Sequence, residues 1–282
     1  MSEPRPTLKL AIGQMCSAAT HAPNIAVMES LVEEAAGQGA DVLCLPEVAG
    51  LMNRDANAAR LIVGTAADDP YLAAARHAAK QAGLWLHPGS TPVQGPDGKF
   101  LNHSVLIDPE GHEVADYDKT HLFDVAIEGQ TPIGESKRFA AGERAVLVQT
   151  PWGKWGMSIC YDLRFPHLYQ RYGQEGATLV FIPAAFTVPT GRAHWEVLLR
   201  ARAIETGCFV IAAAQAGSHE DGRETWGHSL VISPWGEVLA DLGPDAAPSC
   251  TLVELDLSEV TRARAQIPNL KNAQSFGLDI IG

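Results

Sequence analysis

The sequence lacks the features that mark secreted and membrane-spanning proteins. It has five cysteines in 282 residues, an odd number with no Cys-x-x-Cys pair, so a disulfide framework is not expected and a reducing compartment is. Residues 1–7 are polar and proline-rich, without the apolar stretch that secretory signals contain. No apolar run is long enough to span a bilayer. We therefore expect a cytoplasmic protein with no membrane segment.

Positive charge is also scarce. Lysine and arginine number 21 against 33 aspartates and glutamates, which gives a net charge of −12. Binding to nucleic acid needs clustered lysine and arginine, so we expect no nucleic-acid partner. This balance does not restrict the substrate, because one local arginine is enough to bind an anion.

The motifs of the common cofactor and metal enzymes are missing as well. The sequence has no G-x-S-x-G, no P-loop, no G-x-G-x-x-G and no H-E-x-x-H. His103, His112 and His121 are nine residues apart but fall on different expected elements, so a metal site among them is not expected. We expect neither a metal nor an organic cofactor.

Short apolar runs alternate with amphipathic segments through most of the chain. Residues 8–15 and 41–45 are typical of buried strands, and residues 24–37, 70–83 and 164–172 are typical of helices. This alternation predicts an α/β fold. No linker-like segment or charge run divides the chain, so we expect a single domain over residues 1–282. Residues from about 265 to 282 have weak periodicity and are expected to form a tail that packs as coil or wraps a neighbour.

Two segments of the chain resemble each other. Residues 107–116 read Ile-Asp-Pro-Glu-Gly-His-Glu-Val-Ala-Asp and residues 232–241 read Ile-Ser-Pro-Trp-Gly-Glu-Val-Leu-Ala-Asp. Both predict a hairpin with proline and glycine at the turn. The match indicates two structurally related halves, or it reflects only how common such hairpins are.

Cys160 is a candidate nucleophile. It ends an apolar strand, and active-site residues of α/β proteins gather at the carboxyl ends of strands. A helix beginning near Asp162 would lower the pKa of its thiol. The alternative is a buried structural cysteine, which is the usual state of a free cysteine and the interpretation we give to Cys44.

Three charged residues accompany this cysteine. Glu47 follows the apolar run at 41–45, where a carboxylate is costly unless it is used or paired, and burial would suit it to transfer protons near neutral pH. Lys119 follows a strand, and beside a thiolate it would stabilise a developing oxyanion. Glu135 is a further loop carboxylate. Each of them alone is more often a solvated or loop charge.

Three motifs together resemble those of the nitrilase, or carbon–nitrogen hydrolase, superfamily. They are Leu45-Pro-Glu47, Tyr117-Asp-Lys-Thr-His-Leu-Phe-Asp124 and Cys160-Tyr-Asp-Leu-Arg-Phe-Pro166, in matching order over nearly the whole chain. The resemblance implies a four-layer α-β-β-α sandwich of two pseudo-twofold-related halves. It also implies a Glu47–Lys119–Cys160 triad, a second glutamate at Glu135, and at least a homodimer.

Finer features resemble the Nit subgroup, and within it the branch that hydrolyses deaminated glutathione. They are Gly134-Glu-Ser136, residues 185–205, and residues 212–219 with Gly227-His-Ser229. The expected reaction breaks a small amide through a thioester and releases α-ketoglutarate and cysteinylglycine. ω-Amidase activity on α-ketoglutaramate is the alternative, and a catalytically idle interaction or thiol-sensing module is a third.

Further residues are expected to support this reaction. The backbone N–H of Tyr161, directly after the nucleophile, would help to bind the oxyanion. Arg164 would bind a substrate carboxylate through two hydrogen bonds, unless it serves as a structural ion-pair residue. Phe186 would pack against the carbon chain of the substrate.

Overall fold

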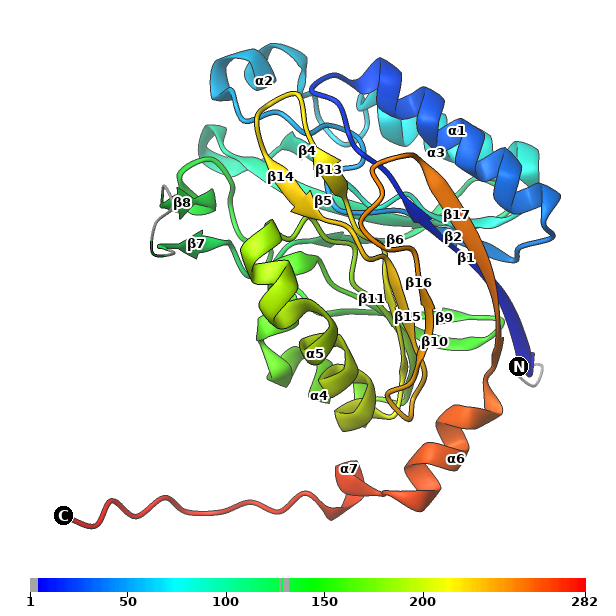
Figure 1. Ribbon diagram of the computed structural model, residues 1–282, viewed down its shortest axis with the longest axis vertical. Helices are drawn as coiled ribbons and strands as arrows, with labels where there is room; N and C mark the ends of the chain where they lie inside the picture. The colour runs from blue at the N-terminus through cyan, green and yellow to red at the C-terminus, as the bar shows by residue number, and fades with distance from the viewer. Residues whose placement is uncertain (1–4, 127, 129–131) are drawn as a thin grey trace.

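The computed structural model describes residues 5–126, 128 and 132–282 (Figure 1). Two mixed sheets carry most of the strands. The first sheet runs β17 (Ser249–Asp256), β1 (Thr7–Gln14), β2 (Val42–Cys44), β3 (Trp85–His87), β5 (Phe100–Ile107) and β4 (Ser90–Gln94), with β6 (Glu113–Asp118) also paired to β5. The second sheet runs β16 (Val238–Asp241), β15 (Leu230–Ile232), β12 (Phe209–Ala212), β11 (Ala177–Phe181), β10 (Gly153–Met157) and β9 (Val146–Thr150).

Helices cover the outer faces of both sheets. Those on the first sheet are α1 (His21–Gly37) and α3 (Pro70–Ala82), and those on the second are α4 (Pro166–Gln174) and α5 (Val188–Thr206) (Figure 1). The order of layers is therefore α-β-β-α, as the resemblance implied. The remaining elements are α2 (Ala56–Ile62), β7 (Asp124–Val125), β8 (Ile133–Gly134), β13 (Ala216–Ser218), β14 (Glu224–Trp226), α6 (Ser258–Gln266), α7 (Asn269–Asn272) and the 3₁₀ turns η1 (Pro96–Gly98), η2 (Glu135–Lys137) and η3 (Cys160–Arg164).

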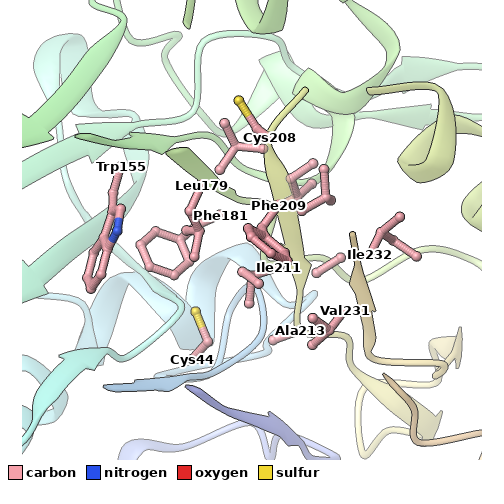
Figure 2. Close-up of a cluster of buried hydrophobic side chains, with 14 of the residues drawn as sticks. Cys44, Trp155, Leu179, Phe181, Cys208, Phe209, Ile211, Ala213, Val231 and Ile232 are labelled. Carbon is pink, nitrogen blue, oxygen red and sulfur yellow. The ribbon is translucent and has the colours of Figure 1, made fainter. Parts of the chain in front are cut away.

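Alternate side chains of β1 point to opposite faces of the sheet, so this one strand contributes to two layers of the core. Leu8, Leu10 and Ile12 point into the core between the sheets, whereas Ala11 belongs to the core under α1 and α3. The core between the sheets continues through bulky side chains of the second sheet, among them Trp155, Phe181 and Phe209 (Figure 2). Cys44 is buried in this same cluster, as expected for a structural cysteine.

The two halves of the chain have the same connectivity. In the first, β1, β2 and β3 are parallel and are followed by antiparallel β5 and β6; in the second, β10, β11 and β12 are parallel and are followed by antiparallel β15 and β16. The two similar segments form the hairpins β5–β6 and β15–β16, each with a bulge at its last paired positions before the turn. The hypothesis of two related halves is therefore confirmed.

Two expectations about helices need correction. The helix expected over 164–172 begins at Pro166, because a proline suits the first position of a helix and disfavours helical geometry just before it. Residues 160–164 form η3 instead. Part of the expected coil tail is helical, since α6 reaches Gln266 and α7 follows; residues 267–268 and 273–282 have neither helix nor strand (Figure 1). Among the described residues, no helix combines the length and apolarity that crossing a bilayer needs.

Candidate active site

Three strand ends bring the predicted triad together. Glu47 lies three residues after β2, and Lys119 directly follows β6, both in the first sheet. Cys160 lies three residues after β10 in the second sheet. The residues come from distant parts of the sequence and meet where the two sheets face each other. All three side chains are buried, with exposed fractions of 5%, 2% and 8% respectively.

Lys119 is the centre of the charged cluster. Its Nζ donates to Glu47 Oε1 at 2.9 Å and to the two Glu135 oxygens at 3.1 and 2.9 Å. Burial by itself lowers the pKa of the ammonium, but the charges of Glu135 and Glu47 outweigh it and raise the pKa well above its ordinary value. Lys119 is therefore a fixed cation between two carboxylates. The Glu135 carboxylate is also held by the backbone N–H of Phe123, at 2.6 Å.

The Cys160 thiol is the second part of the cluster. Burial is the main reason that its pKa lies well above the ordinary value; the charge of Glu47 raises it further, and Lys119 lowers it. The lowered pKa expected from the sequence is therefore wrong, since the helix it relied on starts later and Glu47 opposes Lys119. The thiol rests protonated beside a carboxylate that can accept its proton.

The backbone at Cys160 is strained. Its φ of 48° lies in the left-handed region, which non-glycine residues rarely adopt. The Cys160 N–H donates to the Pro183 carbonyl at 2.9 Å, which ties the turn to the end of β11. Such strain persists where surrounding contacts hold it in place, and it is concentrated at functional sites.

Glu47 is fixed at both oxygens. Oε1 accepts from Asn102 Nδ2 at 2.9 Å in addition to Lys119, and Oε2 accepts from the Ala185 N–H at 2.9 Å. Gln215 Nε2 donates to the backbone carbonyl of Glu47 at 2.9 Å. The carboxylate thus points in one direction, which is what a group that transfers protons requires.

One cationic side chain and two aromatic rings lie beside the triad. The Arg164 guanidinium carbon lies 5.4 Å from the ring centre of Phe186 and 5.9 Å from that of Tyr161. Its Nη1 lies 3.3 Å from His194 Nδ1. Within the described ranges no carboxylate pairs with Arg164, so its charge is available to a ligand. Phe186 is itself packed against Trp195, with ring centres 4.7 Å apart.

The three histidines considered for a metal do not share a site. His103, His112 and His121 each contact a different aspartate, namely Asp118, Asp108 and Asp162. In the part of the chain that the structure describes, one group has donor atoms close enough for a metal ion, His103 with Asp116 and Asp118. There His103 already bonds to Asp118 at 2.7 Å and Asp116 pairs with Arg144, so contacts within the protein account for the cluster.

Comparison with known proteins decides the family. Residues 9–265 match the sequence pattern of the carbon–nitrogen hydrolase family. The chain belongs to the carbon–nitrogen hydrolase family. A deaminated glutathione amidase of Synechocystis is 38% identical over 273 residues, 95% of this chain and 98% of that protein.

Solved structures support the same assignment. The NitFhit protein of C. elegans superposes with a TM-score of 0.87 at 35% identity, covering 96% of this chain and 66% of that one. Saccharomyces cerevisiae Nit3, a member of branch 10 of the nitrilase superfamily, superposes with a TM-score of 0.83 at 25% identity, covering 95% of this chain and 97% of that one. These similarities confirm the family and the fold that the three motifs implied.

Sequence reasoning missed several residues that shape the site of this carbon–nitrogen hydrolase. Asn102 and the Ala185 N–H hold Glu47, but nothing in their local sequence marks them. Asp162 was considered only as the start of a helix, whereas it accepts hydrogen bonds from Tyr117 and His121 of the lysine motif and from Ile159, directly before the cysteine motif. Its place two residues after the nucleophile was the one available signal.

Proposed function

We propose that this carbon–nitrogen hydrolase cleaves deaminated glutathione to α-ketoglutarate and cysteinylglycine, with Cys160, Glu47 and Lys119 as its catalytic residues. The observation that carries the proposal is the buried contact of Lys119 with Glu47 at 2.9 Å beside the buried thiol of Cys160. The substrate is taken from the name of the Synechocystis relative, which this chain matches over nearly its whole length.

The first half of the reaction forms a thioester. Cys160 Sγ attacks the amide carbonyl carbon while its proton passes to Glu47. The Lys119 ammonium and the Tyr161 backbone N–H stabilise the negative oxygen of the tetrahedral intermediate. Glu47 then gives its proton to the amine of cysteinylglycine, the C–N bond breaks, and an α-ketoglutaryl thioester remains on Cys160.

The second half returns the enzyme to its starting state. Glu47 takes a proton from a water molecule, which attacks the thioester carbonyl. The C–S bond breaks, the released acid is α-ketoglutarate, and the proton held by Glu47 returns to the Cys160 thiolate. A fixed carboxylate that acts as base and then as acid in each half typically contributes about 10²–10⁴-fold to the rate. Glu135 keeps Lys119 charged and in place throughout.

Substrate recognition is assigned to the group beside the triad. Arg164 binds the keto-acid carboxylate, and Phe186 packs against the carbon chain next to it. The aromatic rings beneath Arg164 hold the guanidinium in position. α-Ketoglutaramate has the same keto-acid end, so preference between the two substrates depends on contacts with the dipeptide.

The test compares both substrates on the purified full chain. We expect kcat/KM to favour deaminated glutathione over α-ketoglutaramate, and intact mass to show an α-ketoglutaryl adduct on Cys160. Cys160→Ala and Glu47→Gln should each reduce turnover by at least about 10³-fold, with circular dichroism unchanged. Preference for α-ketoglutaramate would overturn the substrate, and activity retained in Cys160→Ala would overturn the mechanism.

We also propose a cytoplasmic homo-oligomer. All five cysteines are free, as expected in a reducing compartment. Large apolar side chains are exposed on α5, on the β15–β16 turn and in the tail, namely Val197, Ile204, Trp235, Phe276, Leu278, Ile280 and Ile281. Apolar side chains that gather on a protein surface mark interaction sites, and we assign these to contact with a second copy of the chain.

A further inference from the structure

Asp162 is a buried carboxylate that the proposed reaction does not use. Its side chain is fully buried, and each oxygen accepts two hydrogen bonds. Oδ1 accepts from the N–H of His121 at 2.9 Å and from His121 Nδ1 at 2.7 Å. Oδ2 accepts from the Tyr117 hydroxyl at 2.8 Å and from the Ile159 N–H at 2.9 Å. These four donors occupy about all the acceptor capacity that a carboxylate has.

The donors belong to two separate parts of the site. Ile159 directly precedes the nucleophile, and its bond to Asp162 closes the turn in which Cys160 has φ of 48°. Tyr117 and His121 stand two residues before and two residues after Lys119, so Asp162 holds the lysine segment from both sides. One carboxylate therefore joins the nucleophile turn of the second sheet to the lysine loop of the first.

The neighbours of Asp162 keep this junction rigid. The His121 ring is stacked on Phe165, with ring centres 3.6 Å apart, and the Tyr117 hydroxyl also contacts Thr120 Oγ1 at 2.9 Å. Burial and then the charge of Asp162 raise the pKa of Tyr117 far above its ordinary value, so this hydroxyl stays a donor. Every bond in the network requires an acceptor at the position of each Asp162 oxygen.

We propose that Asp162 is the positioning residue that sets Cys160 against Lys119. The inference deepens the proposed function, because it assumes that these two residues act together. Glutamate is too long for this turn, and asparagine would present an NH₂ group to two of the four donors. A displacement of the reacting groups by about 1 Å can cost about 10²-fold in rate, so the loss would appear in kcat and not only in stability.

The test uses Asp162→Asn with Asp69→Asn as its matched control. Asp69 is also fully buried and accepts the Leu72 N–H at the start of α3, where asparagine caps equally well. The measurements are Tm, kcat, KM and the rate at which iodoacetamide alkylates Cys160, followed by peptide mass. We expect Asp162→Asn to lower kcat by about 10²-fold with KM nearly unchanged, and to slow alkylation because Lys119 no longer favours the thiolate. Asp69→Asn should leave kcat and alkylation unchanged.

A second variant keeps the test decisive if Asp162→Asn does not fold. Tyr117→Phe removes one donor to Asp162 and should lower kcat and alkylation in the same direction by about tenfold, and the double variant should lose less than the product of the two effects. Asp162→Asn that lowers only Tm, or a Tyr117→Phe variant with unchanged alkylation, would overturn the positioning role. A wild-type enzyme that does not cleave deaminated glutathione but whose Cys160 alkylation depends on Asp162 would refute the substrate and leave the positioning role intact.

Discussion

At the scale of single residues, burial and two neighbouring charges of opposite sign set the pKa of the Cys160 thiol. Burial and Glu47 keep the thiol protonated, and Lys119 favours the thiolate. A protonated thiol is protected from casual oxidation. In the proposed mechanism, the thiolate forms only when a substrate carbonyl is present and Glu47 takes the proton.

The opposing effects predict an unusual result for Glu47→Gln. Removing the negative charge of Glu47 removes one of the causes that raise the pKa of Cys160, so that pKa should fall. We expect the pH profile of Cys160 alkylation by iodoacetamide to move toward lower pH, while amide turnover is lost. Glu110→Gln, at an exposed site, is the control and should not shift the profile. A profile that stays in place or moves to higher pH would contradict the role of Glu47 in keeping the thiol protonated.

At the scale of elements, the close approach of two loops places Glu47. Gly89, after β3, has φ of 74°, and a Cβ there would lie 1.8 Å from the Pro46 carbonyl oxygen. The Ser90 N–H donates to that same carbonyl at 3.3 Å, and the Ser90 hydroxyl accepts from the Val48 N–H at 2.8 Å. The loop after β2 therefore rests directly on the backbone of the loop after β3.

Gly89→Ala should therefore damage both stability and catalysis. The methyl group must displace the Pro46 carbonyl and, with it, the adjoining Glu47, so we expect a loss of at least about 3 kcal/mol in the free energy of unfolding and a clear fall in kcat. Gly83→Ala is the control, because Gly83 has φ of 65° and a Cβ there would meet no atom within 4 Å. It should lose about 1 kcal/mol from backbone strain alone and keep its kcat. Urea denaturation and steady-state kinetics measure both; equal effects of the two substitutions would show that contact with Pro46 is unimportant.

The strand ends of this site could be predicted from the sequence, but the contacts among its side chains could not. Glu47 and Cys160 could be located because each stands at the end of an apolar run, and Lys119 because it directly follows an expected strand; such elements depend on the local sequence pattern. Asn102 could not, since its contact with Glu47 depends on the order of β2, β3 and β5 in the first sheet. The pKa of Cys160 was predicted in the wrong direction because burial, the main cause of its rise, and the nearby charge of Glu47 are both properties of the folded chain.

At the scale of the whole molecule, the C-terminal segment extends away from the two sheets (Figure 1). Phe276, Leu278 and Ile280 alternate along it, which puts them on one side of an extended chain. Their side chains are 83–90% exposed. Exposed apolar side chains arranged in this way mark an interaction site.

Truncation after Asn272 should therefore weaken self-association. We expect the full chain to sediment as a dimer or larger species, and the truncated chain to dissociate at a higher protein concentration, by about tenfold or more in Kd. Trp235→Ala tests the surface beside α5, and Leu61→Ala, an exposed apolar residue on α2, is the control. Analytical ultracentrifugation measures both. A full chain that is monomeric at all concentrations would refute the assembly.

The matching connectivity of the two halves gives the molecule two equivalent places for an acid–base group. Leu45-Pro46-Glu47 follows β2, and Ile182-Pro183-Ala184 follows its counterpart β11 at the same spacing. One half thus ends its second parallel strand in a carboxylate, and the other ends it in a methyl group. In the proposed mechanism, only the first of these two strand ends supplies an acid–base group, and Ala184 stands at the equivalent place in the second half.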